Sequence, residues 1–195
     1  MIDVEVYAPV RIDLTGGATD VSPFKDREGG RIVNMAINLD NKPSVKVRAT
    51  QIPEKMLILR GGGVQSEERI DCWQSLQDLT TPLRLLKVAL MKRMQKVAER
   101  PFPEALQCVF GSGVYCSVES AVPRESGLGT SGSIGVALVH ALNILTGSDV
   151  LYLDDQSKYT IASQANTLEN KGLSITSGGQ DQLAAMFGGF NDIAF

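Results

Sequence analysis

The sequence predicts an α+β fold in a domain of 195 residues. Strand-like patterns dominate its first half, and amphipathic helical patterns dominate its second half. The two kinds of element are segregated along the chain, so we favour α+β over a regular βαβ array. Hydrophobic residues make up 43% and charged residues 21% of the chain, the composition of a packed domain. The length predicts one domain and leaves room for a second small lobe.

The first half contains five segments that we expect to be β-strands. Each is short, rich in alternating or β-branched residues, and bounded by turn-forming residues. The segments are 3–7, 31–39, 44–50, 56–59 and 68–72. We expect a turn at 40–43 to join the second and third strands, and glycines 61–63 to form a turn between the last two.

From Pro82 onward the chain contains four segments that we expect to be helices. Pro82 suits the first turn of a helix, with Thr80 and Thr81 before it as caps. This helix has one apolar face and should end near Pro101. The other helices are expected at 131–145, 156–169 and 180–187, and Gly147 suits the C-cap of the first of these. Strands are expected at 114–120 and 190–195.

Charge and hydropathy exclude several classes of function. The net charge of −3 provides no electrostatic basis for binding nucleic acid or an anionic membrane. No apolar run approaches the roughly 20 residues that span a bilayer, and the N-terminus lacks the apolar segment of a signal peptide. We therefore expect a cytoplasmic protein. The sequence does not distinguish a monomer from a homodimer.

The cysteines and the single histidine suggest no metal centre. Cys72, Cys108 and Cys116 are widely spaced and odd in number, so we expect reduced, mostly buried thiols. His140 lies in the middle of a predicted helix, where we expect a structural role. A Ser-His-Asp triad is excluded unless His140 serves in it.

The stretch 123–133, with the sequence PRESGLGTSGS, is the most informative part of the chain. A glycine-rich loop that opens a helix leaves backbone N–H groups free to bind an anion, and the helix dipole adds to the attraction. No lysine follows the glycines, so this is not a Walker A loop, and the spacing is not that of a dinucleotide fingerprint. Taken alone, such a loop is as often a plain connection.

The N-terminal segment 8–20 follows the first strand and places Arg11, Asp13 and Asp20 around Gly16 and Gly17. One interpretation is a loop with solvated charges. The other is a polyol site, because carboxylates accept hydrogen bonds from sugar hydroxyls and a guanidinium stabilises nearby negative charge. Glycines there allow the backbone to approach a ligand closely.

In the segment 169–182, Glu169 ends one predicted helix and Asp181 begins the next. The simple explanation of Asp181 is a favourable interaction with the helix dipole. A second explanation of Asp181 is phosphoryl transfer from ATP. That reaction needs backbone amides on the phosphates, oxygen ligands for Mg²⁺ and a carboxylate facing the attacking hydroxyl. Ser131 and Glu169 could hold the metal ion, and Asp181 could face the hydroxyl.

Together the three segments resemble the signature motifs of the GHMP kinases. The loop is similar to the family pattern Pro-x-x-x-Gly-Leu-Gly-Ser-Ser, with Thr130 and Ser131 at the paired serines. The resemblance implies a ribosomal-protein-S5-domain-2-like N-terminal domain of an ATP- and Mg²⁺-dependent kinase that acts on a sugar or sugar phosphate. The segments that look closest to the D-glycero-D-manno-heptose 7-phosphate kinases, with the L-fucokinases a near second, are 16–24, 29–30, 33–39, 180–182 and 187–191. Phosphorylation of an anomeric hydroxyl is the implied reaction.

The resemblance also assigns roles to particular residues. It implies Asp181 as the catalytic carboxylate and Arg11 as its partner, and Ser131 and Glu169 as the metal ligands. The substrate-binding residues that it implies are Asp13, Gly16, Gly17, Asp20 and Asp181. The ATP-binding residues that it implies are Gly127, Leu128, Gly129, Thr130, Ser131 and Gly132.

Three departures from the family pattern qualify these expectations. Gly17 and Ala18 stand where galactokinases have a glutamate and a histidine, which argues against galactose. Arg124 and Glu125 replace small residues, and a carboxylate there must turn away from a triphosphate. The third family motif is absent, so we expect residues 1–195 to be the N-terminal domain of a longer kinase. A non-catalytic sugar- or nucleotide-binding module is the alternative.

Overall fold

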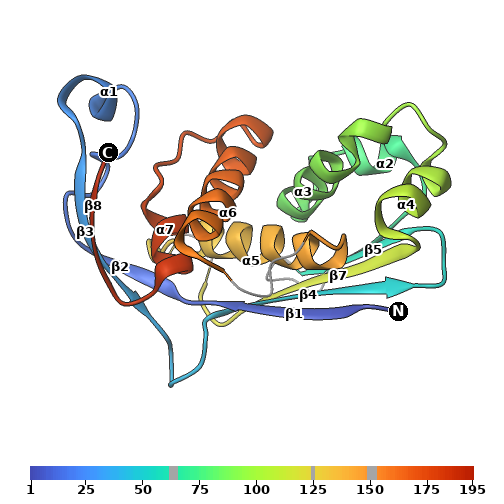
Figure 1. The fold of residues 1–195 in the computed structure, drawn as a ribbon, viewed down its shortest axis with the longest axis horizontal. Coiled ribbons are helices and arrows are strands. Elements are labelled where there is room, and N and C mark those ends of the chain that lie inside the picture. The colour runs from blue at the N-terminus through green and yellow to red at the C-terminus, as the bar shows by residue number, and fades with distance from the viewer. Residues whose placement is uncertain (62–65, 124–125, 149–152) are drawn as a thin grey trace.

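The computed structural model describes residues 1–61, 66–123, 126–148 and 153–195, and contains two β-sheets with helices packed against them (Figure 1). The larger sheet has five strands in the order β1-β4-β7-β5-β6, and the smaller has three in the order β2-β3-β8. Helices lie on one face of the larger sheet, so this part of the molecule has two layers. Among the described residues, no helix is long and apolar enough to cross a membrane.

The elements follow one another with short connections. The strands are β1 (Asp3–Ala8), β2 (Val10–Thr15), β3 (Arg31–Ile37), β4 (Val45–Ile52), β5 (Leu57–Gly61), β6 (Ser66–Ile70), β7 (Gly113–Ser120) and β8 (Phe190–Ala194). The helices are α1 (Phe24–Glu28), α2 (Trp73–Gln77), α3 (Arg84–Met94), α4 (Phe102–Phe110), α5 (Thr130–Leu145), α6 (Asp155–Thr167) and α7 (Gln180–Phe187). A 3₁₀ turn, η1 (Gln95–Val97), extends α3, and a π-helical turn, η2 (Leu168–Gly172), extends α6.

Helix α5 forms the centre of the core. It lies across β1 and β4 and is covered by α3, α6 and α7, so it is apolar on almost every side. The inward side chains of β4, such as Val45 and Val47, are fully buried beneath it. Because α5 begins at the glycine loop, the core holds that loop at one end of the larger sheet.

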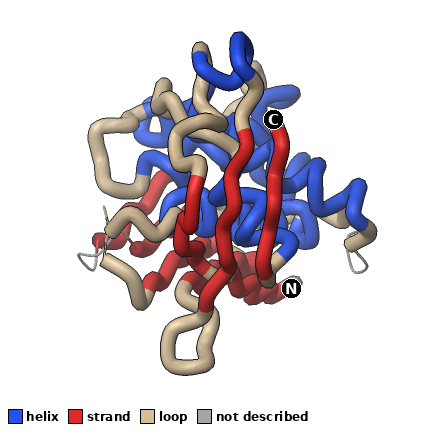
Figure 2. Tube along the Cα trace, turned by 90° about the vertical axis from the view of Figure 1, so that its left-hand side faces the viewer, coloured by secondary structure: helices blue, strands red, loops and turns tan. Residues whose placement is uncertain are grey.

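The chain passes from the larger sheet to the smaller one at Pro9. β1 pairs with β4, whereas β2 pairs with β3, and Pro9 alone separates β1 from β2. Figure 2 shows the three strands of the smaller sheet side by side. The segment 8–20, expected to be a loop, therefore contains a strand. Val10, Ile12 and Leu14 follow strand alternation, but the charged residues that alternate with them, Arg11 and Asp13, obscure the pattern.

The turn expected at 40–43 is present, but the strands beside it do not pair. Asp40 and Asn41 have positive φ angles of 50° and 58°, and Leu39 bridges Lys42. Beyond the turn, β3 joins the smaller sheet and β4 the larger one. The turn was predicted correctly. The strands on either side of it enter different sheets, because a local turn does not determine which sheet each strand joins.

Three short helices, α1, α2 and α4, were not expected. In α4 two prolines, Pro101 and Pro103, made a helix look unfavourable. Pro101 is the N-cap and Pro103 lies in the first turn, where no N–H group is required, and Gly111 ends the helix with φ of 72°. The other predicted strands and helices agree with the structure to within a few residues. Positions 62 and 63 of the expected glycine turn lie outside the described residues.

The cysteines correct one expectation. Cys116 on β7 is buried, but Cys72 and Cys108 are exposed, so the thiols are not mostly buried. All three are free, as expected. Burial raises the pKa of the Cys116 thiol to about 12, which suppresses its reactive thiolate form.

We therefore expect two classes of thiol. In the native protein at about pH 8, Cys72 and Cys108 should react quickly with a disulfide reagent, and Cys116 only after unfolding. Counting released thiolate with and without denaturant measures both classes. In the Cys72→Ser/Cys108→Ser variant the fast phase should vanish, and its persistence would show that Cys116 is accessible.

Candidate active site

Arg11 joins the three segments that the sequence singled out. Its Nε donates to Oδ1 of Asp181 at 2.7 Å, and its Nη1 donates to the carbonyl oxygen of Gly127 at 2.7 Å. Its backbone N–H donates to the carbonyl oxygen of Leu128 at 2.9 Å. The structure thus brings strand β2, the glycine loop and the start of α7 together.

The glycines of the loop are required for different reasons. Gly127 and Gly129 have φ angles of 76° and 72°, a conformation that residues with a side chain rarely adopt. At Gly129 and Gly132 a Cβ atom would also lie 2.8 Å and 2.5 Å from atoms of Asp181. The absence of side chains therefore lets α7 pack directly against the loop.

The start of α5 can accept an anion. Its N-cap residue, Gly129, has no side chain to cap the helix, so N–H groups of the first turn lack a capping partner. The hydroxyl of Thr130 is buried and has no hydrogen-bond partner among the described residues. Arg124 and Glu125, which depart from the family pattern, lie outside the described residues.

Glu169 lies in η2, beside the start of α5, and is 3% exposed. Its carboxylate accepts hydrogen bonds from the hydroxyl of Ser131, from Nε2 of Gln182 at 2.7 Å and from the hydroxyl of Ser177 at 3.1 Å. Burial raises the pKa of Glu169 more than these hydrogen bonds lower it. A π-helical turn at this position is notable because such turns are frequent at functional sites.

Ser131 and Glu169 have the chemistry of a magnesium site. Mg²⁺ takes oxygen ligands, usually one or two from protein with phosphate and water oxygens completing the set. The hydroxyl and the carboxylate are in direct contact beside the helix start. In the part of the chain that the structure describes, no three His, Cys, Asp or Glu residues gather as a larger metal centre would require. The pair therefore fits a magnesium ion shared with phosphate.

The expected substrate residues fall into two environments. Asp13 accepts a long hydrogen bond of 3.4 Å from Nε2 of Gln180 and lies at the edge of the site. Asp20 is 1% exposed and accepts a hydrogen bond from the backbone N–H of Gln180 at 3.1 Å. Gly16 and Gly17 pack closely, since a Cβ atom would lie 2.0 Å from Arg31 O and 2.5 Å from Asp13 Oδ2, respectively.

Burial and charge act in opposite directions on Asp181. Burial is the largest influence and raises its pKa, the guanidinium of Arg11 lowers it, and the carboxylates of Asp20 and Asp13 raise it further. The net result is a raised pKa. The negative charges of Asp13 and Asp20 act on Asp181, so this region is acidic, which suits a ligand that donates hydroxyl hydrogen bonds.

Two asparagines that the sequence interpretation did not single out hold the loop before α7. Asn170 donates to Ser177 O at 3.0 Å and accepts from Ser177 N at 2.9 Å. Asn166 donates to Gly178 O at 2.5 Å. Their spacing of four residues on one helix was the available signal, because it places both side chains on the same face.

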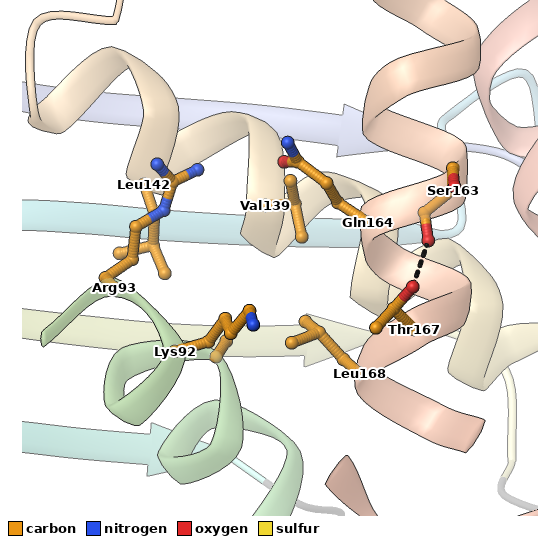
Figure 3. Close-up of a pocket in the computed structure, with 9 residues that line it drawn as sticks. Lys92, Arg93, Val139, Leu142, Ser163, Gln164, Thr167 and Leu168 are labelled. Atoms are coloured by element: carbon orange, nitrogen blue, oxygen red, sulfur yellow. Dashed lines mark hydrogen bonds between the residues drawn. The ribbon is translucent and has the colours of Figure 1, made fainter. Parts of the chain in front are cut away.

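A separate cavity of about 370 Å³ lies between α3, α5 and α6 (Figure 3). Its lining combines apolar residues such as Val139 and Leu142 with the cations Lys92 and Arg93. None of the expected site residues lines it. The candidate active site is instead the region around Arg11 and Asp181.

The fold and this site together place the chain in a family. Residues 89–189 match the sequence profile of the GHMP kinases N terminal domain, which spans more than half of the chain. The protein therefore belongs to the GHMP kinase family, as its motifs predicted.

The chain is similar in sequence to two kinds of sugar kinase. The chain is 31% identical over 148 residues to the L-fucokinase/L-fucose-1-P guanylyltransferase of Bacteroides fragilis, covering 72% of this chain and 16% of that protein. It is 27% identical over 201 residues to the D-glycero-alpha-D-manno-heptose 7-phosphate kinase of Campylobacter jejuni, covering 100% of this chain and 51% of that protein.

A solved structure confirms the expected fold. A D-glycero-D-manno-heptose 1-phosphate kinase from Bacteroides thetaiotaomicron superposes with a TM-score of 0.77 at 26% identity, covering 100% of this chain and 56% of that one. The chain thus spans about half the length of these heptose kinase relatives, and far less of the fucokinase.

Replacing Arg11 should change the titration of Asp181. Without the guanidinium, in Arg11→Met, the pKa of Asp181 should rise further. The folded state then keeps this proton to higher pH than the unfolded chain does. As pH increases from the pKa of Asp181 in the unfolded chain to its pKa in the folded state, the free energy of unfolding falls. In Arg11→Met this pH range should be wider than in the wild type.

Carboxyl-detected NMR titration and urea unfolding across pH measure both effects. Arg31→Met is the matched control, since it removes an exposed ion pair with Asp192. It should leave the Asp181 titration unchanged. An unshifted Asp181 midpoint in Arg11→Met would show that the ion pair does not control this carboxylate.

Proposed function

We propose that this domain transfers the γ-phosphoryl group of ATP to a hydroxyl of a sugar. The observation that supports this most directly is the position of Asp181, held by Arg11 at 2.7 Å and packed against the glycine loop that starts α5. A phosphate bound at that loop and a hydroxyl facing Asp181 would be neighbours. Family membership supports the same reaction class.

Each residue then has a definite task. Asp181 orients the acceptor hydroxyl and takes its proton, while Arg11 favours the ionised form of Asp181 and offsets developing negative charge. The amides at the start of α5, with Thr130 and Ser131, hold the phosphates. Ser131 and Glu169 would hold Mg²⁺, which neutralises phosphate charge when bound.

We further propose a heptose phosphate as the acceptor, phosphorylated at the anomeric hydroxyl. Two proteins that match this chain over its whole length are named as heptose phosphate kinases. The carboxylates of Asp13 and Asp181 suit the many hydroxyls of such a sugar. L-Fucose is the second candidate, because the relative at 31% identity is an L-fucokinase.

As part of the same proposal, residues 1–195 act as the N-terminal domain of a longer kinase. The chain spans about half the length of the heptose kinases that it matches, and this supports the proposal. Activity is therefore to be measured in the full-length gene product. A site closed by further protein would exclude water that otherwise competes at the phosphates.

The acceptor is tested with a substrate panel. Release of ADP with Mg²⁺ and ATP should be fastest with a heptose 7-phosphate, slower with L-fucose and absent with galactose. ³¹P NMR of the product would identify the hydroxyl that is phosphorylated. Sugar binding without ADP release in the full-length protein would instead favour a non-catalytic binding module.

The role of Asp181 is tested by Asp181→Asn. Loss of the base should lower turnover by about 10²–10⁴-fold, the usual contribution of general-base catalysis. Asp192→Asn is the matched control, because Asp192 is a surface carboxylate paired with Arg31 away from Asp181. Turnover of Asp181→Asn close to that of the wild type would remove Asp181 from this role.

A further inference from the structure

The peptide groups of Gln180, the residue before Asp181, are held by two buried side chains. Gln180 is the first residue of α7, where an N–H group has no partner within the helix. The N-cap residue, Gly179, has no side chain to supply one. Oδ2 of Asp20 accepts this N–H at 3.1 Å, so Asp20 caps α7 from a position 160 residues earlier in the chain.

Asn34 holds the other side of the same residue. Its Nδ2 lies 3.4 Å from the carbonyl oxygen of Gln180, and its Oδ1 accepts from Nδ2 of Asn191 at 3.1 Å. Asn34 is 0% exposed and is the cross-strand partner of Asn191, on β3 and β8. Asp20, in the connection after β2, therefore holds the N–H group of Gln180, and Asn34, on β3, holds its C=O group.

Gly178 shows how closely the capping carboxylate fits. A Cβ atom at Gly178 would lie 1.8 Å from Oδ2 and 2.1 Å from Cγ of Asp20. The φ angle of Gly178 is not in the left-handed region, so the requirement for glycine is steric. Any side chain at this position would push Asp20 away from the Gln180 amide.

We propose that Asp20 is a positioning residue, whose buried carboxylate caps α7 and so holds Asp181 against Arg11 and the glycine loop. This inference rests on the proposed kinase function. It differs from the sugar-binding role that the family resemblance implied for Asp20, because a carboxylate in a residue 1% exposed and engaged by a backbone amide presents almost no surface to a ligand.

Two single variants and their combination test the cap. Asp20→Ala removes the acceptor, and Gly178→Ala displaces it while the carboxylate stays in the chain. In Asp20→Ala/Gly178→Ala the smaller side chain at position 20 leaves room for the new methyl group. The double variant should therefore disturb the Gln180 amide no more than either single change does. Asp20→Asn keeps an oxygen acceptor and should restore the cap. Asp26→Ala, which removes an exposed carboxylate on α1, is the matched control.

Hydrogen exchange of the Gln180 amide, followed by NMR, reports the cap without any assay of activity. It should speed up by about tenfold or more in Asp20→Ala and Gly178→Ala, as expected for losing a hydrogen bond to a charged group. It should stay near the wild-type rate in Asp20→Asn and Asp26→Ala. An unchanged Gln180 amide in Asp20→Ala and Gly178→Ala would overturn the proposal.

Kinetics of the full-length protein separate positioning from sugar binding. Displacement of Asp181 should lower kcat by about 10–100-fold in both single variants, with the KM for sugar nearly unchanged. A raised sugar KM at unchanged kcat would overturn the positioning role and make Asp20 a sugar ligand.

If Asp20→Ala fails to fold, Gly178→Ala and Asp20→Asn provide the same comparison. A wild-type protein that transfers no phosphate, but whose Gln180 amide responds as described, would contradict the proposed function and leave the cap established.

Discussion

The ion pair between Arg11 and Asp181 is the interaction on which the site depends. It joins residues 170 positions apart, and the same guanidinium also binds the carbonyl oxygen of Gly127. Both side chains are mostly shielded from water, with exposed fractions of 13% and 21%. A carboxylate in that setting is costly to ionise without a cation beside it. The contact therefore holds the three segments together and opposes the rise that burial causes in the pKa of Asp181.

The architecture explains how these segments reach one another. The chain leaves the larger sheet at Pro9 and enters the smaller one, and the hydroxyl of Ser133 on α5 donates to the carbonyl oxygen of Pro9 at 2.7 Å. Helix α5 is thereby attached to the crossing point itself. Arg11 follows two residues after Pro9 and contacts the glycine loop that precedes α5. The site lies where the two sheets and the central helix meet.

Local patterns predicted elements whose chemistry is local. Helix α7 was predicted with its observed bounds, and α5 within one residue, because a glycine and hydroxyl run precedes an apolar periodic segment in each case. Strand β2 was missed because Arg11 and Asp13 face a polar site where a core would be expected. The sequence did not predict which sheet β3 and β4 each join, because their common turn is compatible with a hairpin and with a crossover between sheets.

The sequence by itself determined the chemical groups of the site and the loops that present them. Glycines at 127 and 129, hydroxyls at 130 and 131, and carboxylates at 13, 20, 169 and 181 are all evident without coordinates. Only the tertiary structure decided which of these groups are buried and which partners they have. Asp20 faces a backbone amide and Glu169 faces Ser131, contacts between segments that no local pattern relates. Desolvation and hydrogen bonding depend on distances between such segments, and packing of the whole domain sets those distances.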